Sequence, residues 1–144
     1  LCIDHYGDEV VNQYSERLAK ITPLIAPRMK HIIDAPDMVS YVLITDLIVD
    51  KEFIKTCKLS DSDISAALDR TIQYMQTEKD FSKDVLEEQM RAICEELSSS
   101  PRNYFGLIRN VLTGRTATPP LFDIIEILGS KETVARLQRA STLF

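Results

Sequence analysis

A chain of 144 residues, of which 44% are hydrophobic and 27% charged, has the composition of a folded globular protein and is too hydrophobic for a disordered one. This length can bury one good core or two small helical lobes, which excludes a multidomain enzyme. The net charge of −5 argues at first against a nucleic-acid partner, which normally requires a basic face. However, residues 1–100 contain 11 Lys and Arg against 19 Asp and Glu, whereas residues 101–144 contain six against three. The sequence therefore predicts a basic C-terminal lobe on an acidic body.

The sequence contains no signal for membrane insertion or secretion. Its apolar stretches are interrupted by Asp46 and Asp50 and are far shorter than the roughly 20 residues that span a bilayer. The N-terminus has neither an initiating Met nor a basic region, and we expect it to be a cut within a longer chain. The three cysteines are scattered and in no CxxC spacing, so neither a disulfide framework nor a zinc site is predicted. We expect a reducing, cytoplasmic setting.

The first predicted helix covers residues 8–25, where apolar side chains recur every three or four positions. Pro23 and Pro27 make its C-terminal end irregular, because each proline removes a backbone donor and disfavours helix at the residue before it. Arg28 is therefore expected just past a break in the helix.

The run 38–44, after Pro36, fits either a short helix or a strand by its pattern, and its position between helical segments favours a helix. Residues 45–59 have no clear period and are expected to form a connector. We place the lobe boundary there, which gives a first lobe of residues 1–58 and a second of residues 59–144.

Five further helices are predicted in the second lobe from periods of three or four residues and from capping signals. Gly114 and Gly129 are expected to close two of them. No alternation of period two occurs, so the predicted fold class is all-α, a helical bundle of six or seven helices. The N-terminal signals of the five helices, in chain order, are Ser60-Asp61, Ser82, Ser100-Pro101, Thr118-Pro119 and Ser130.

No residue pattern in the chain indicates catalysis. His5 and His31 stand alone, outside any metal-ligand spacing, and the four isolated glycines form no phosphate-binding loop. The acidic pairs at 87–88 and 95–96 have Arg91 between them at helical spacing, which is typical of a solvated helix face. Any catalysis must come from elsewhere.

The unusual segment is residues 106–129, where two predicted helices meet at a loop that presents Arg115, Thr116 and Thr118. One explanation is a tight corner whose prolines fix only its geometry. The segment also resembles the C-terminal signature of bacterial glutamyl-tRNA synthetases, and residues 27–43 resemble the preceding helices of that family more weakly. The matching residues are Arg109, Leu112-Thr113-Gly114, Thr118-Pro119-Pro120-Leu121-Phe122, Leu128-Gly129 and Arg136-Leu137-x-x-Ala140.

The resemblance implies a two-lobed helical anticodon-binding domain that recognises tRNA(Glu), as the C-terminal part of a glutamate–tRNA ligase. The nucleotide-binding signatures of the class I enzymes are absent, so the ATP, Mg²⁺ and glutamate sites are expected in a portion outside this chain. The chain alone should hold no cofactor or metal and should not charge tRNA. No DNA or membrane partner is expected, and the full-length enzyme is expected to be a cytoplasmic monomer.

The resemblance also assigns roles to individual residues. Arg28 corresponds to the arginine that tests the third anticodon base, which is C in tRNA(Glu) and G in tRNA(Gln), and it suggests that tRNA(Gln) is refused. Arg109 and the turn Thr118-Pro119-Pro120-Leu121 correspond to the residues that hold the first two bases, with Leu121 packing on a base face. Pro120 replaces the glycine of many members, which removes a backbone donor. Candidate phosphate contacts are Arg102, Arg115, Lys131 and Arg139.

Several alternatives stay open. Arg28 could be a helix-end arginine that pairs with Asp34 or Asp37, and the four candidate phosphate contacts could simply be solvated. The chain could be a helical protein-interaction module whose basic C-terminal lobe docks on an acidic partner. It could also be a small stand-alone regulator that descends from a synthetase.

Overall fold

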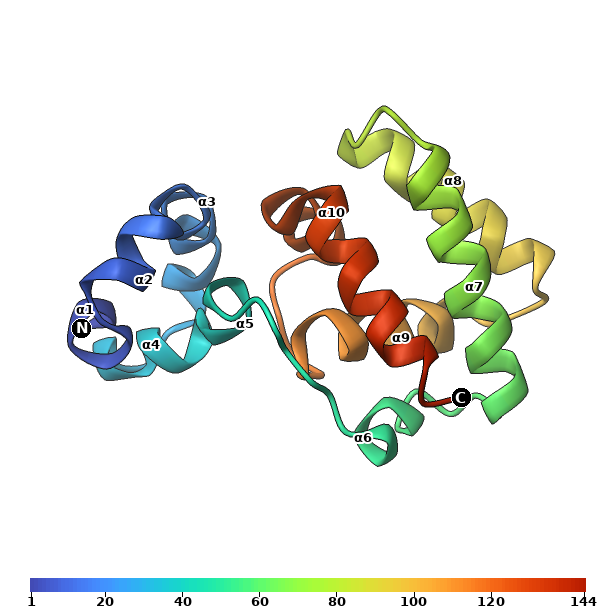
Figure 1. Cartoon of the computed structure of the whole chain (residues 1–144), viewed down its shortest axis with the longest axis horizontal. Coiled ribbons are helices and arrows are strands. Elements are labelled where there is room, and N and C mark those ends of the chain that lie inside the picture. The colour runs from blue at the N-terminus through green and yellow to red at the C-terminus, as the bar shows by residue number, and fades with distance from the viewer. The chain divides into compact units, whose positions relative to one another are not determined.

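The computed structural model describes all 144 residues, Leu1–Phe144, and consists of helices and the segments that join them (Figure 1). This confirms the predicted all-α class. The chain divides into two compact units, unit 1 from Leu1 to Thr45 and unit 2 from Asp46 to Phe144. None of the helices combines the length and the apolar character that crossing a bilayer requires.

Unit 1 is built from short helices around a small apolar core, to which Ile21, Ile25 and Val42 contribute buried side chains. The hydroxyl of Tyr6 donates a hydrogen bond to the carbonyl of Pro36 at 2.6 Å and so connects the first and fourth helices. The elements are α1 (Cys2–Tyr6), α2 (Asp8–Gln13), α3 (Ser15–Ile25), the 3₁₀ turns η1 (Ala26–Arg28) and η2 (Ile32–Asp34), α4 (Ala35–Met38) and α5 (Ser40–Leu43).

The helix predicted over residues 8–25 is divided in two, because Tyr14 (φ −111°, ψ 23°) leaves the helical conformation between α2 and α3. The irregular C-terminal end is confirmed: α3 stops at Ile25, two residues after Pro23, and passes into the 3₁₀ turn that contains Arg28. The segment 38–44 is mostly helical, as predicted, within single turns of α4 and α5.

Unit 2 contains the longer helices, and α10 packs against both α7 and α9 (Figure 1). The side chains of Leu68, Leu107 and Leu137 are fully buried where these three helices meet. Gly129 (φ 79°, ψ 165°) kinks α10, so that the two helices predicted on either side of it follow one another without a loop. The elements are α6 (Lys51–Lys55), α7 (Asp61–Thr77), α8 (Lys83–Glu96), α9 (Pro101–Thr113) and α10 (Leu121–Ser141).

The structure has ten α-helices where the sequence predicted six or seven. Most of the additional ones have four to six residues, for example α4, α5 and α6, which is too short for a helical period to appear in the sequence. The long helices α7 and α9 begin where they were predicted, since Ser60 and Ser100 accept hydrogen bonds from the backbone N–H three residues later.

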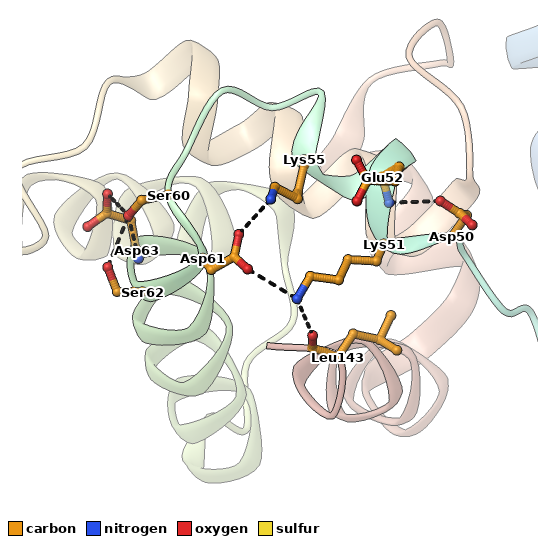
Figure 2. A network of polar contacts seen from close by, with 9 residues as sticks. All are labelled: Asp50, Lys51, Glu52, Lys55, Ser60, Asp61, Ser62, Asp63 and Leu143. Carbon is orange, nitrogen blue, oxygen red and sulfur yellow. Dashed lines mark hydrogen bonds and ion pairs between the residues drawn. The ribbon is translucent and has the colours of Figure 1, made fainter.

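The chain passes from unit 1 to unit 2 between Thr45 and Asp46, at the start of the predicted connector, whereas the predicted boundary was at residue 58. Residues 46–58 belong to unit 2 because α6 is bound to its neighbours by side chains. The amide of Asn110 on α9 donates to Thr56 Oγ1 at 3.0 Å. The carboxylate of Asp61 on α7 pairs with Lys51 and Lys55 of α6 at 3.1 and 3.0 Å (Figure 2).

Candidate functional site

The hydroxyl of Thr113 forms hydrogen bonds that hold the start of the loop between α9 and α10. Gly114 ends α9 in the left-handed conformation (φ 64°, ψ 22°), which a glycine adopts without the strain of a side chain. Thr113 Oγ1 accepts from the N–H of Arg115 at 3.0 Å and lies 2.8 Å from the carbonyl of Arg109, to which it donates. The start of the loop is therefore fixed to the last turn of α9.

The far end of the loop holds the side chain of Arg109. Arg109 Nε donates to Thr118 Oγ1 at 3.0 Å, and this hydroxyl donates in turn to the carbonyl of Pro119 at 2.9 Å. Thr118 is only 9% exposed, so the bond is shielded from solvent. The terminal amino groups of Arg109 make no hydrogen bond within the chain, which leaves four N–H donors for a ligand.

The predicted cap-then-proline start at Thr118 and Pro119 is wrong. Helix α10 begins at Leu121 with Pro120 as its N-cap residue, and no side chain caps it. The hydroxyl of Thr118 is instead occupied by Arg109 and the Pro119 carbonyl. This turn therefore orients an arginine and does not cap a helix.

The remaining turn residues differ in exposure. Pro120 is exposed, whereas Pro119 is buried. Leu121 is 4% exposed and contributes to the core of unit 2, so in this conformation its side chain has little surface on which a base could pack.

A cavity of about 260 Å³ opens beside Arg109. It lies between the end of α6, one face of α9 and the loop, and three of its lining residues are cationic while none is acidic. Lys58 and Arg102 are both exposed and form no ion pair within the chain. The residues that line it are Thr56, Cys57, Lys58, Arg102, Asn103, Gly106, Arg109, Asn110 and Thr116.

The wall of this cavity formed by the end of α6 is fixed by the polar network in Figure 2. Asp50 caps α6, since its Oδ1 accepts from the N–H of Glu52 at 2.7 Å. Hydrogen bonds from Lys55 and Lys51 hold the pKa of Asp61 below its ordinary value, and the same contact raises the pKa of Lys55. Lys51 also donates to the carbonyl of Leu143 at 2.7 Å, near the C-terminus.

Arg28 lies in unit 1, in the turn η1, and its side chain is exposed. The pairing with Asp34 or Asp37, left open by the sequence, is not formed. The carboxylate of Asp34 instead accepts from the N–H of His31 at 3.1 Å. Arg28 makes no ion pair or hydrogen bond within the chain, so its guanidinium is available to a ligand.

The structure places the four candidate phosphate contacts at different positions. Arg102 lines the cavity beside Arg109, and Arg115 lies in the loop at the end of α9. Lys131 is exposed on α10. Arg139 is engaged by its own unit, through the carbonyl of Leu47 at 3.4 Å and the carboxylate of Glu132 at 3.7 Å.

Arg136, which the charge count placed in the basic lobe, does not reach the surface. It is 1% exposed, donates to Glu132 at 2.8 Å and donates to the carbonyl of Leu112 at 2.6 Å. Fewer cationic side chains of the C-terminal lobe are therefore accessible to a ligand than the sequence indicated.

Sequence reasoning did not find Lys58, Asn103 or Gly106 as cavity residues. Asn103 and Gly106 lie on the same face of α9 as Arg102 and Arg109, at spacings of three and four, so the helical period could have pointed to them. Lys58 gave no such signal, because it lies in the connector and meets α9 only in the folded chain.

Comparison with known proteins finds one family that matches nearly the whole chain. A family model described as an anticodon binding domain matches residues 4–141. The chain is 33% identical over 134 residues to the glutamate–tRNA ligase of a Roseiflexus species, covering 93% of this chain and 26% of that protein. It is 34% identical over 125 residues to that of Roseiflexus castenholzii (85% and 24%) and 32% identical over 120 residues to that of Cutibacterium acnes (81% and 24%). The chain thus spans about a quarter of the length of these curated relatives.

Proposed function

Because this chain belongs to the anticodon-binding domain family, we propose that it recognises the anticodon of tRNA(Glu) as part of a glutamate–tRNA ligase. The observation that carries the proposal is Arg109, whose guanidinium is fixed at Nε by Thr118 and keeps its terminal donors free beside a cationic cavity. The matches to glutamate–tRNA ligases cover 81–93% of the chain, which supports glutamate as the amino acid that the ligase attaches.

The chemistry of arginine suits the reading of unpaired bases. Its planar guanidinium can stack on a base and present several donors in a fixed geometry. A cytosine turns the acceptors O2 and N3 toward such donors, whereas a guanine turns the donors N1–H and N2–H to the same place. Arg28 and Arg109 are the two residues with free guanidinium donors to which the resemblance assigns bases.

We assign the attachment of glutamate, with ATP and Mg²⁺, to the parts of such a ligase that this chain does not cover. We expect the ligase to be a cytoplasmic monomer. The task of this chain is then to bind the anticodon loop and to distinguish its bases.

The test is the affinity of the chain for the tRNA(Glu) anticodon stem-loop and for the same stem-loop with G as third anticodon base. We expect a preference for C of about tenfold, or ~1.4 kcal/mol. Arg28→Gln should abolish the preference, because it removes the charged donors. Lys30→Gln, which removes an exposed charge two residues away, should weaken binding to both stem-loops equally.

Equal affinity of the unaltered chain for both stem-loops would contradict the role of Arg28. Equal affinity for the stem-loop and for a scrambled RNA of the same length would contradict anticodon recognition as a whole.

A further inference from the structure

We propose that the cavity beside Arg109 is a subsite for one phosphodiester-linked nucleotide of single-stranded RNA, in which Lys58 and Arg102 bind the phosphate and Gly106 leaves room for the nucleotide. This inference rests on the proposed function and deepens it. It adds Lys58 and Gly106, from two different elements, to the residues that the family resemblance assigns.

The charge of the cavity favours an anionic occupant. In the chain as a whole, the 22 Asp and Glu outnumber the 17 Lys and Arg. Lys58, Arg102 and Arg109 nevertheless gather at one cavity without a carboxylate among its lining residues. Their mutual repulsion is relieved when a phosphate enters, because each cation can then donate a charge-assisted hydrogen bond.

The size of the cavity limits the occupant. Pockets that enclose drug-sized ligands have roughly 300–1,000 Å³, and this cavity has about 260 Å³. It can therefore take a phosphate with part of its nucleotide, but not a run of nucleotides.

Gly106 keeps this space open. A glycine inside a helix costs roughly 0.5–1 kcal/mol relative to alanine, and it is usually explained by a close neighbour. At Gly106 a Cβ would meet nothing within 4 Å, so no packing contact of the folded chain requires the glycine. The missing side chain instead enlarges the cavity between Arg102 and Arg109.

The position of Lys58 is set by the fold. Its backbone has a φ of 65°, which is uncommon for a residue with a side chain. Lys58 lies three residues after the end of α6, and its N–H donates to the carbonyl of Lys55 at 3.0 Å. Helix α6 is itself held by the ion pairs of Asp61 and by Asn110. The amino group of Lys58 is thereby carried on a fixed segment to the face of α9 that bears Arg102.

The neighbours of the cations favour a nucleotide over a simple anion. Asn103 and Thr116 line the same cavity and offer both uncharged donors and acceptors. A base or a ribose can use both kinds of group, whereas an ionised phosphate uses only the donors. Arg109 connects the cavity to the turn at Thr118, so a strand bound there could pass from the phosphate subsite to the residues expected to hold bases.

The experiment measures the affinity of the 144-residue chain for the tRNA(Glu) anticodon stem-loop over a series of salt concentrations. Lys58→Gln and Arg102→Gln should each weaken binding about five- to tenfold and reduce the slope of log K against log salt by about 0.7. Lys58→Gln keeps a long side chain at the same φ, so its backbone strain matches that of the parent. Lys79→Gln, which removes an exposed charge elsewhere in unit 2, is the matched control and should change neither quantity.

The subsite would be overturned if Lys58→Gln and Arg102→Gln lost no more affinity and salt slope than Lys79→Gln. The proposed function would still stand in that case if the preference for C as third base remained. If the base preference is absent but both variants lose affinity and salt slope, the subsite stands and anticodon recognition fails. An acidic peptide that binds as tightly as the stem-loop, with the same sensitivity to the two variants, would overturn the assignment to RNA. Thermal melts of each variant show that the fold is kept.

Discussion

Thr118 shows how one hydroxyl can set the direction of a longer side chain. Its oxygen accepts from Arg109 and its hydrogen reaches the Pro119 carbonyl, so both of its capacities are used inside a shielded turn. The guanidinium is thus oriented before any ligand arrives, which lowers the entropy cost of binding. The sequence pattern of a polar residue before a proline suggested a helix cap instead, because the partner of Thr118 lies nine residues earlier and is invisible to local rules.

Gly106→Ala should stabilise the chain by up to about 1 kcal/mol, because alanine has the higher helix propensity and loses less backbone entropy on folding. The new methyl group meets no atom within 4 Å, so no strain offsets the gain. Urea denaturation of both proteins measures the difference. A loss of stability would show that the glycine is needed for packing and would weaken its role in keeping the cavity open.

At the scale of elements, the contact between α10 and α9 depends on an arginine that the charge pattern had counted as surface. Arg136 reaches the carbonyl of Leu112, in the last turn of α9, where a helix leaves its carbonyl groups without intrahelical partners. The cation also lies at the negative end of the helix dipole. Burial of Arg136 is compensated by Glu132, one turn earlier on α10.

Replacement of this arginine should be costly. Arg136→Met leaves the carbonyl of Leu112 without its donor and Glu132 without its partner, and we expect a loss of about 3–5 kcal/mol. The control is Arg91→Met, since Arg91 has the same spacing to Glu87 but lies on an exposed face. That pair should contribute less than about 0.5 kcal/mol. Similar losses in the two variants, measured by chemical denaturation, would be inconsistent with a buried role for Arg136.

The elements also show what could be predicted from the sequence. Helices α7 and α9 were found because their caps and periods are local, and Ser60 and Ser100 act as those patterns indicate. The five-residue helix α6 was missed because it is too short to show a helical period and because side chains outside it, from Asp61 and Asn110, stabilise it. The same holds for the candidate site: Arg109 and Thr118 were found through a motif, whereas Lys58 joins them only through the position of α6.

At the scale of the whole molecule, the boundary between the units depends on the network in Figure 2. Lys51 pairs with Asp61 at the start of α7 and places its amino group 4.5 Å from the centre of the Phe144 ring. One side chain therefore connects α6, the start of α7 and the last residue of unit 2. This is why residues 46–58 belong to the C-terminal unit, although nothing in their own sequence indicates it.

The contacts of Asp61 with α6 make the stability of unit 2 dependent on pH. Its hydrogen bonds with Lys55 and Lys51 lower its pKa in the folded chain below the ordinary value of 3.8, so the unfolded chain takes up a proton first as the pH falls. The stabilisation is therefore complete above that value and is lost as the pH falls through the lowered pKa. Asp61→Asn should reduce the free energy of unfolding at pH 7 and make it less dependent on pH below about 4.

Urea denaturation at pH 7 and at several values below 4 measures both effects of Asp61→Asn. The control is Asp84→Asn, since Asp84 is an exposed aspartate in the first turn of α8 that forms no ion pair. Removing Asp84 takes away only a charge near a helix N-terminus, an effect of about 0.3–1 kcal/mol. If the two variants have the same acid dependence, the contacts of Asp61 with α6 do not hold that helix to unit 2, and the fixed wall beside Lys58 loses its explanation.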